Sequence, residues 1–371
     1  MITLQRIIAL AIKEMLAILR DSQSRFVLIG PPIAQLLVFG YAATYDLNHI
    51  PVAVYNEDRS VVARELVAKI TGSPHFELVA RVDHDAQIAP LIDNKDVLMV
   101  LHLGPRFSDD IKRGITAPVQ VIIDGRNSNT ALLTLGYLRT IFTDFNYEQA
   151  RKLGLPAVPA ALQIRPWYNE NLLSRWFVVP GIIGLLMLVV TTTVTGLSVA
   201  REREAGTFDQ LLMTPMRPFE ILVGKSIPGL LIGLAEGTFI LVVAVWWFDI
   251  PLRGSIGALY LGMFLFLMSA VGVGLMISSL AVTQQQGILG AFLFLVPAVI
   301  LSGFATPVSN MPEVVQQLTV VNPLRYFLVI VRGVFLEGDS WTLLFDQYWP
   351  MAIIAVLTLA AAGWLFRHRM S

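Results

Sequence analysis

Long uncharged segments recur along the chain, and six of them have a length that suits a transmembrane helix. About 20 mostly apolar residues are needed to cross the hydrocarbon core of a bilayer as a helix. Because backbone polar groups in lipid must be hydrogen-bonded within their own segment, we interpret all six as helices. They are residues 26–45, 176–200, 226–248, about 256–281, about 288–303 and 347–366. The polar sequence TQQQG at 283–287 separates the fourth from the fifth.

Between the first two of these segments the pattern changes to that of a soluble domain. Alternating and β-branched runs predict strands, and helical spacing predicts helices between them. The predicted strands are 52–55, 76–81, 97–102, 119–124 and 162–168, and the predicted helices are 60–70, 83–93 and 127–152. The predicted fold class is therefore an α-helical polytopic membrane protein with six transmembrane helices and a mixed α/β extracytoplasmic domain inserted between helices 1 and 2.

Lys and Arg residues gather before the first span and after the second and sixth spans, and they set the predicted orientation. Positive residues mark the cytoplasmic side of short membrane loops. They are Arg6, Lys13, Arg20, Arg25, Arg201, Arg203, Arg217, Lys225, Arg367 and Arg369, whereas the turn after the third span has only Arg253. Both termini are therefore predicted to be cytoplasmic, and the inserted domain, residues 46–175, is predicted to lie outside.

Residues 1–25 carry mixed charge ahead of the first apolar span, so they do not resemble a secretory signal. Arg6, Lys13 and Arg20 are seven residues apart and share one helix face. Another face carries Leu4, Ile7, Ile8, Ala11, Met15 and Leu19. We interpret this pattern as a cytoplasmic amphipathic helix in the membrane interface, in preference to a soluble surface helix. Transmembrane helix 1 then occupies 26–45, and helices 2–6 occupy 176–371.

Composition supports a membrane protein and excludes several kinds of chemistry. The chain has 371 residues, of which 55% are hydrophobic and only 15% charged. Its 27 basic and 27 acidic residues balance, so charge gives no reason to expect a nucleic-acid partner. The absence of cysteine excludes disulfides, thiolate metal sites and a cysteine nucleophile. The spacing of His49, His75, His84 and His102 matches no standard zinc pattern, and we predict neither a metal site nor catalytic residues.

The third predicted span carries candidate packing or pathway residues. Gly229, Gly233 and Gly237 are spaced four apart, which lets helices approach closely. Glu236 lies beside this ridge, and a carboxylate inside a membrane span is a functional candidate by default. A hydrogen-bonded Glu236 that joins helices is an equally good interpretation, and both stay open.

A possible nucleotide site is rejected on its spacing. The sequence Gly224-Lys225-Ser226 resembles the end of a phosphate-binding loop, but that motif needs a glycine where Phe219 stands. We interpret Lys225 as a cytoplasmic anchor of the third span. The chain is predicted to bind no cofactor, so any ATP-driven activity needs a partner that binds ATP and magnesium.

The second span ends in four consecutive charges, RERE at 201–204, and a short helical segment follows. Its apolar face would consist of Phe208, Leu211 and Leu212. Thr207 and Gln210 have the spacing of a capping box, and Gly206 permits a bend before it. Such a helix would expose its apolar face unless a partner docks there, or unless it rests on lipid headgroups.

Two long stretches resemble ABC-2 type export permeases, the membrane subunits of one class of ATP-binding-cassette exporter. They are AREREAGTFDQLLMTPMRPFEILVGK at 200–225 and LSGFATPVSNMPEVVQQLTVVNPLRYFLVIVRGVFLEG at 301–338. The order of parts also agrees over essentially the whole chain. The resemblance is greatest to bacterial multidrug-type permeases with a large domain between spans 1 and 2.

The resemblance implies a coupling helix and its lead-in at 201–214, seated in a cleft of the ATPase subunit. The implied coupling residues are Glu202, Arg203, Glu204, Gly206, Thr207, Phe208, Gln210, Leu211 and Leu212. Residues 304–338 would form short re-entrant helices in the outer leaflet. A second permease chain, identical or paralogous, would complete the pathway, and in this family the outside domain often meets a periplasmic adaptor.

These expectations combine into one function, with one rival. The chain is expected to be the permease subunit of an exporter in the bacterial inner membrane, where it moves hydrophobic or amphipathic compounds outward. It is expected to have no enzymatic activity, because ATP is hydrolysed in the partner. The rival is a membrane-anchored receptor that signals inward, but its largest predicted cytoplasmic segment has only about 25 residues, too few for an output module.

Overall fold

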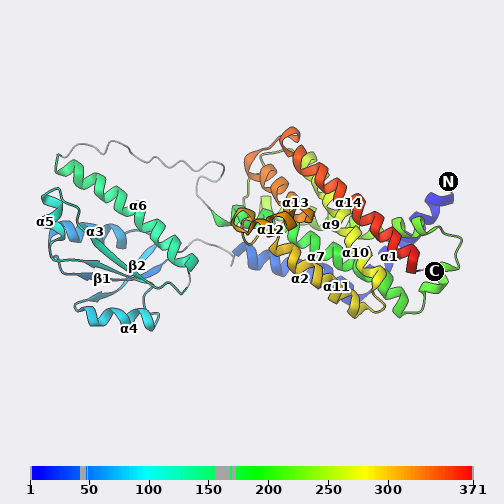
Figure 1. Ribbon diagram of the computed structural model, residues 1–371, viewed down its shortest axis with the longest axis horizontal. Coiled ribbons are helices and arrows are strands. Elements are labelled where there is room, and N and C mark those ends of the chain that lie inside the picture. Colours follow the sequence, from blue (N-terminus) through cyan, green and yellow to red (C-terminus); the bar gives the residue numbers. More distant parts are fainter. Residues whose placement is uncertain are drawn as a thin grey trace. The chain divides into compact units, whose positions relative to one another are not determined.

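The computed structural model describes residues 2–41, 47, 49–126, 128–154, 168 and 173–369 (Figure 1). Contacts divide the chain into two compact units, which are described separately. The membrane unit comprises Met1–Thr44 and Pro166–Ser371, and the inserted domain comprises Tyr45–Arg165.

The inserted domain is built on a four-stranded mixed sheet with strand order β2-β1-β3-β4. The strands are β1 (Ile50–Asn56), β2 (Phe76–Val82), β3 (Met99–Leu103) and β4 (Val119–Ile123). The first three are parallel, and β4 runs antiparallel to β3. These strands confirm four of the predicted ones. The fifth, at 162–168, lies outside the described residues except for Tyr168.

Helices cover both faces of this sheet (Figure 1). They are α3 (Val61–Thr71), η1 (Asp85–Gln87), α4 (Ile88–Asp93), α5 (Phe107–Lys112) and α6 (Ser128–Lys152). The main core joins β1 and β3 to α3, α5 and α6, whereas α4 covers the opposite face. The hydroxyl of Ser60 caps α3 by accepting a hydrogen bond from the amide of Ala63 at 3.1 Å.

The membrane unit is almost entirely helical. Its elements are α1 (Ile2–Arg20), α2 (Ser22–Tyr41), α7 (Ser174–Glu204), α8 (Phe208–Leu212), α9 (Pro218–Trp246), α10 (Ile256–Leu280), α11 (Gln284–Ile300), η2 (Val308–Asn310), α12 (Glu313–Leu318), η3 (Thr319–Val321), α13 (Pro323–Arg332), η4 (Gly333–Glu337) and α14 (Trp341–Arg369). Helix α7 is central, because it contacts α2, α9, α10, α11 and α13 and is buried over most of its length.

Four helices among the described residues are long and apolar enough to cross a membrane: α7, α9, α10 and α14. A fifth crossing is possible only if the bent pair α12–η3 and α13–η4 counts as one. The first and fifth predicted spans correspond to the shorter apolar helices Leu28–Tyr41 and α11. The structure therefore shows a polytopic helical membrane protein with four to five candidate spans, and the count of six stays a prediction.

Within 304–338 the chain bends by 85° between Glu313–Val321 and Pro323–Glu337, and the re-entrant position of these helices in the outer leaflet stays a prediction. Asn322 occupies the corner, where its side-chain oxygen accepts from the amide of Leu324 at 3.1 Å. Its side-chain nitrogen donates to the carbonyl oxygen of Ala298 at 2.7 Å. One side chain therefore caps α13 and fastens the bend to α11.

The glycines of α9 lie against α7 and α10. A Cβ atom on Gly229 would lie 2.3 Å from Cγ2 of Thr195, and one on Gly233 would lie 2.4 Å from a methyl carbon of Leu267. On Gly237 it would lie 2.4 Å from the terminal methyl of Met263. These helices are therefore close enough that only glycine fits.

Gly229→Ala is expected to lower the thermal unfolding midpoint of the detergent-solubilised protein. Thr195 cannot rotate freely out of the way, because its hydroxyl donates to the carbonyl of Thr191 at 2.7 Å. Overpacking of this kind costs about 1–3 kcal/mol. The same substitution at Gly196 is the control, since its Cβ would lie 3.9 Å from the nearest atom. Equal midpoints for the two variants would show that the α7–α9 contact tolerates a methyl group.

Candidate functional site

One apolar cluster ties the short helix α8 to both terminal helices of the chain. Phe208 of α8 packs with Leu10 of α1, Ile221 of α9 and Phe366 of α14. The rings of Phe208 and Phe366 meet edge to face, with centroids 6.1 Å apart. The first and last helices therefore approach α8 at the same end of the membrane unit (Figure 1).

Beside this cluster lies a group of four charges that we call the ion cluster: Lys13 and Glu14 of α1, Glu202 of α7 and Lys225 of α9. The Lys225 side chain is 1% exposed. Its Nζ lies 2.8 Å from Oε1 of Glu14 and 2.7 Å from Oε2 of Glu202. Lys13 forms an ion pair with Glu202 from the other side. The charges of the ion cluster therefore sum to zero.

The ion cluster fixes α1 to α7 and α9. A buried charge without a partner costs several kcal/mol, so each member depends on the others. The hydroxyl of Ser198 donates to Glu14 at 3.2 Å and adds a further link to α7. At Lys13, burial opposes the charged form, but the hydrogen bond to Glu202 and the charges of Glu202 and Glu14 outweigh it and raise the pKa. Lys13 therefore stays protonated near neutral pH.

The next two residues of the charged run bind two further helices. Arg203 donates to the carbonyl oxygens of Ser279 and Ala281 at 2.9 and 3.1 Å, where α10 ends. The carboxylate of Glu204 accepts from the amide of Gln284 at 2.8 Å, where α11 begins. A carboxylate at a helix N-terminus is favoured by the helix dipole. Residues 202–204 thus connect the end of α7 to α1, α9, α10 and α11.

Glu202, Arg203 and Phe208, whose contact with an ATPase stays a prediction, have partners within the chain's own bundle. Other helices take up their charges and apolar surface. Lys225, interpreted from the sequence as a cytoplasmic anchor, is buried within the ion cluster. Glu14, which sequence reasoning missed, belongs to the buried stripe of α1. That stripe consists of Ile7, Leu10, Ala11, Glu14 and Ile18.

The remaining coupling residues lie around α8. Gly206 has a φ of +69°, which a residue with a side chain adopts rarely, and the hydroxyl of Thr207 donates to the carbonyl of Glu202. Gln210 is exposed and Leu211 is half-buried against the apolar cluster. The side chain of Leu212 lies outside the described residues.

The outermost apolar side chain of this region was not among the predicted coupling residues. Met213 follows α8 and is 88% exposed. It falls outside the i, i+3, i+4 pattern that selected Phe208, Leu211 and Leu212, so periodicity alone did not select it.

Buried Glu236 and half-buried Arg332, farther along the membrane unit, have polar atoms without hydrogen-bond partners among the described residues. Glu236 is 9% exposed, and neither carboxylate oxygen has a hydrogen-bond partner in the part of the chain that the structure describes. The guanidinium of Arg332 lies 3.9 Å from the ring centroid of Phe177, with Nε and Nη2 unpaired in the same described part. Burial without partners is costly. Both residues are therefore candidates for function and not for stability.

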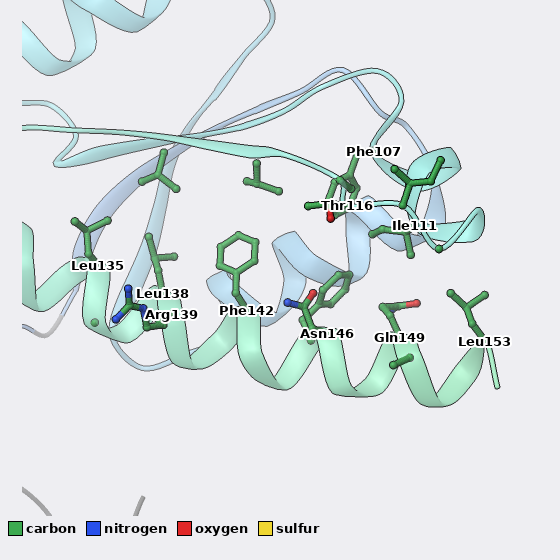
Figure 2. Close-up of a pocket in the computed structure, with 18 of the residues that line it drawn as sticks. Phe107, Ile111, Thr116, Leu135, Leu138, Arg139, Phe142, Asn146, Gln149 and Leu153 are labelled. Atoms are coloured by element: carbon green, nitrogen blue, oxygen red, sulfur yellow. The ribbon is translucent and has the colours of Figure 1, made fainter. Parts of the chain in front are cut away.

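The inserted domain contains a cavity of about 1040 Å³ between α6, α5 and β4. Figure 2 shows Leu135, Leu138 and Phe142 of α6 below Phe107 and Ile111 of α5. The lining is mostly apolar, and among the described residues that line the cavity Arg139 alone carries a formal charge. This volume lies at the upper end of the range usual for small-molecule pockets.

Histidines of the inserted domain have structural roles. His102 pairs with Glu57 at 3.0 Å and stacks on Tyr55, and His75 stacks on Tyr137. Burial disfavours protonated His102, but its hydrogen bonds to Glu57 and Gln120 prevail and raise its pKa. Across the described ranges, no group of three or more His, Asp or Glu residues is arranged to hold a metal ion.

Comparison with known proteins places these features in a family. Residues 26–364 match the model of the ABC-2 family transporter proteins. The chain is 38% identical to the probable multidrug ABC transporter permease YbhR of Escherichia coli (strain K12), over 96% of this chain and 97% of the relative. It is 32% identical to the probable multidrug ABC transporter permease YbhS of the same strain, over 98% and 94%. The inner membrane transport permease YhhJ of that strain is 27% identical, over 98% and 95%.

Lys225→Met is expected to destabilise the protein by about 3–5 kcal/mol, because it leaves Glu14 and Glu202 buried without their cation. The predicted observations are a lower unfolding midpoint in detergent and faster tryptic cleavage within α1. Adding Glu14→Gln to Lys225→Met should recover part of the loss. Lys13→Met is the control, since Lys13 is half-exposed and exposed pairs contribute about 1 kcal/mol or less. Similar losses for Lys13→Met and Lys225→Met would contradict the central role of Lys225.

Proposed function

Because the chain belongs to the ABC-2 family of transporter proteins, we propose that it is the membrane permease subunit of an ATP-driven exporter in the bacterial inner membrane. ATP and magnesium are bound by separate ATPase subunits, and this chain binds no cofactor. The exported compounds are hydrophobic or amphipathic. The names of the relatives, which are transport permeases, favour this function over a receptor that signals inward.

The observation that carries this proposal is the connection of residues 202–204 to four other helices. Glu202 is held by α1 and α9, Arg203 by the end of α10, and Glu204 by the start of α11. The guanidinium of Arg203 also lies 5.0 Å from the ring centroid of Phe208 in α8. A displacement of α8 would therefore be transmitted to the bundle through short polar contacts, as a coupling helix requires.

The ATPase subunit docks on the outer surface of α8 and not on the face that sequence periodicity selected. Phe208 is already buried, whereas Met213 and Gln210 are exposed. Met213 offers the apolar contact, and Gln210 and Thr214 surround it with polar groups. An apolar centre with a polar rim is the usual composition of a protein interface.

A second permease chain, identical or paralogous, completes the export pathway. Helix α11 exposes a continuous apolar stripe that the rest of this chain leaves uncovered. The stripe consists of Leu289, Phe292, Leu293, Val296 and Ile300, each 40% exposed or more. The inserted domain lies outside the membrane in this proposal, where a periplasmic adaptor is the partner expected for it.

Met213→Asp is expected to abolish co-purification of the ATPase while membrane insertion and thermal stability stay unchanged. The side chain is already exposed, so the charge costs the fold little, but burying it against a partner costs several kcal/mol. Val79→Asp, at a 53% exposed apolar site in the inserted domain, is the control. Normal ATPase binding and export by Met213→Asp would exclude this surface as the docking site.

Orientation is testable because the chain contains no cysteine. A cysteine at Glu77 in the inserted domain should react with an impermeant thiol reagent in cells with a permeabilised outer membrane. A cysteine at Gln210 should react only after the inner membrane is opened. Both positions are exposed, so access through the membrane alone decides the result. The reverse labelling would place the inserted domain in the cytoplasm.

A further inference from the structure

An apolar groove of about 730 Å³ runs between α9 and α14 at the end of the membrane unit where the ion cluster lies. Leu222, Ile227 and Leu230 form one wall, and Leu359 and Gly363 form the other. A Cβ atom on Gly363 would lie 3.8 Å from Cδ2 of Leu222, so the missing side chain keeps the groove open. The lining of the groove is mostly apolar, which suits a hydrocarbon chain.

The open end of the groove carries positive charge. Trp364, Arg367 and His368 lie on one face of the last turns of α14, and all three line the groove. The rings of Trp364 and His368 lie 4.3 Å apart. Arg367 is exposed and has no ion pair with any described residue, and no Asp or Glu lines the groove. Among the described residues, the guanidinium of Arg367 therefore has no anionic partner.

The position of the groove indicates the source of a counter-charge for Arg367. Helices α9 and α14 both satisfy the criteria for a membrane span, and they are the two least covered by protein among the four that do. Arg367 lies in the last turn of α14, so a membrane crossing by α14 would place it near the lipid headgroups. Basic pockets between transmembrane helices bind the headgroups of anionic lipids, and Trp is enriched at the same level.

We propose that the groove is a binding site for an anionic phospholipid. The phosphate group lies against Arg367 and Trp364, and one acyl chain occupies the space beside Gly363. The site requires only that α9 and α14 lie in a membrane, so it goes beyond the proposed transport function and does not depend on the direction of export. A second copy of this chain fits less well, because an apolar helix would bring no anion to Arg367.

The bound lipid also supports the ion cluster. Leu222 lines the groove and packs against the apolar cluster of Leu10, Phe208 and Phe366. It lies one turn before Lys225 on α9. An acyl chain packed against Leu222 therefore stabilises the position of α9, the helix that carries Lys225. Loss of the lipid is expected to weaken the packing of α1 and α8 against it.

The test measures lipid binding by the purified full-length chain in detergent, by native mass spectrometry and thermal shift. Phosphatidylglycerol and phosphatidylcholine with the same acyl chains are titrated separately. Phosphatidylglycerol is expected to bind more tightly and to raise the unfolding midpoint. Glycerol phosphate without acyl chains is expected to produce no shift, which distinguishes a lipid from a free phosphate.

Variants separate the two halves of the site. Arg367→Gln is expected to weaken phosphatidylglycerol binding about tenfold, the value of one hydrogen bond to a charged group. It is expected to weaken phosphatidylcholine binding less, because the choline cation already offsets the charge of that phosphate. Arg367→Lys should retain most of the preference. Gly363→Phe fills the groove and should weaken the binding of both lipids. Arg20→Gln, an exposed cation outside the groove, is the control and should bind as the parent does.

Three results would overturn the proposal. The first is equal binding of the two lipids by the parent chain, and the second is an unchanged preference in Arg367→Gln. The third is cross-linking of a second copy through a cysteine at Gly363 with no lipid retained. These readouts involve neither ATP nor transport. A chain that exports normally but binds no lipid would contradict only the lipid site. A chain that binds lipid but does not export would contradict only the proposed transport function.

Discussion

The buried ammonium of Lys225 is the constraint on which the architecture of the membrane unit depends. A charge at 1% exposure is tolerated only with counter-charges at hydrogen-bonding distance, and Glu14 and Glu202 supply them from two other helices. Helix α1 therefore cannot lie wholly in the membrane interface. One side packs on α9, while Leu4, Ile8, Ile12, Leu16 and Leu19 remain exposed on another. The same helix thus serves as protein core and as a surface suited to lipid.

Helix α8, which has only five residues and lies beside the ion cluster, is held in place by packing against neighbouring helices. Short helices are marginal alone, so their stability comes from packing. Phe208 anchors α8 in the apolar cluster, and Arg6 of α1 donates to the carbonyl oxygen of Pro215 just beyond it at 2.6 Å. The proposed coupling helix is therefore part of a small core shared by the N-terminal helix, the C-terminal helix and α9.

Hydropathy predicted the four long apolar helices α7, α9, α10 and α14 and the α/β character of the insert, because each depends on local periodicity. Hydropathy did not predict which residues the charged side chains contact. RERE at 201–204 looks solvent-exposed, yet its partners are one lysine about 20 residues later, another lysine nearly 190 residues earlier and the ends of two helices. Glu14 could have been noticed, because it occupies a core position in the stripe that Ile7, Leu10, Ala11 and Ile18 define. The apolar face chosen from the sequence mixed that stripe with the exposed one.

Helix α9 makes ion pairs near its start and close van der Waals contacts in its middle. Near its start, Lys225 forms directional bonds that tolerate little displacement. In its middle, Gly229 and Gly233 contact α7 and α10 through close van der Waals packing, which has no preferred hydrogen-bond geometry. Glu236 follows, buried and unpaired among the described residues. A stable protein gains nothing from such a carboxylate, since an apolar residue of similar size would remove the desolvation cost. The stability of the described fold therefore does not account for Glu236, and a functional role for this carboxyl group beside the close-packed glycines is the better explanation.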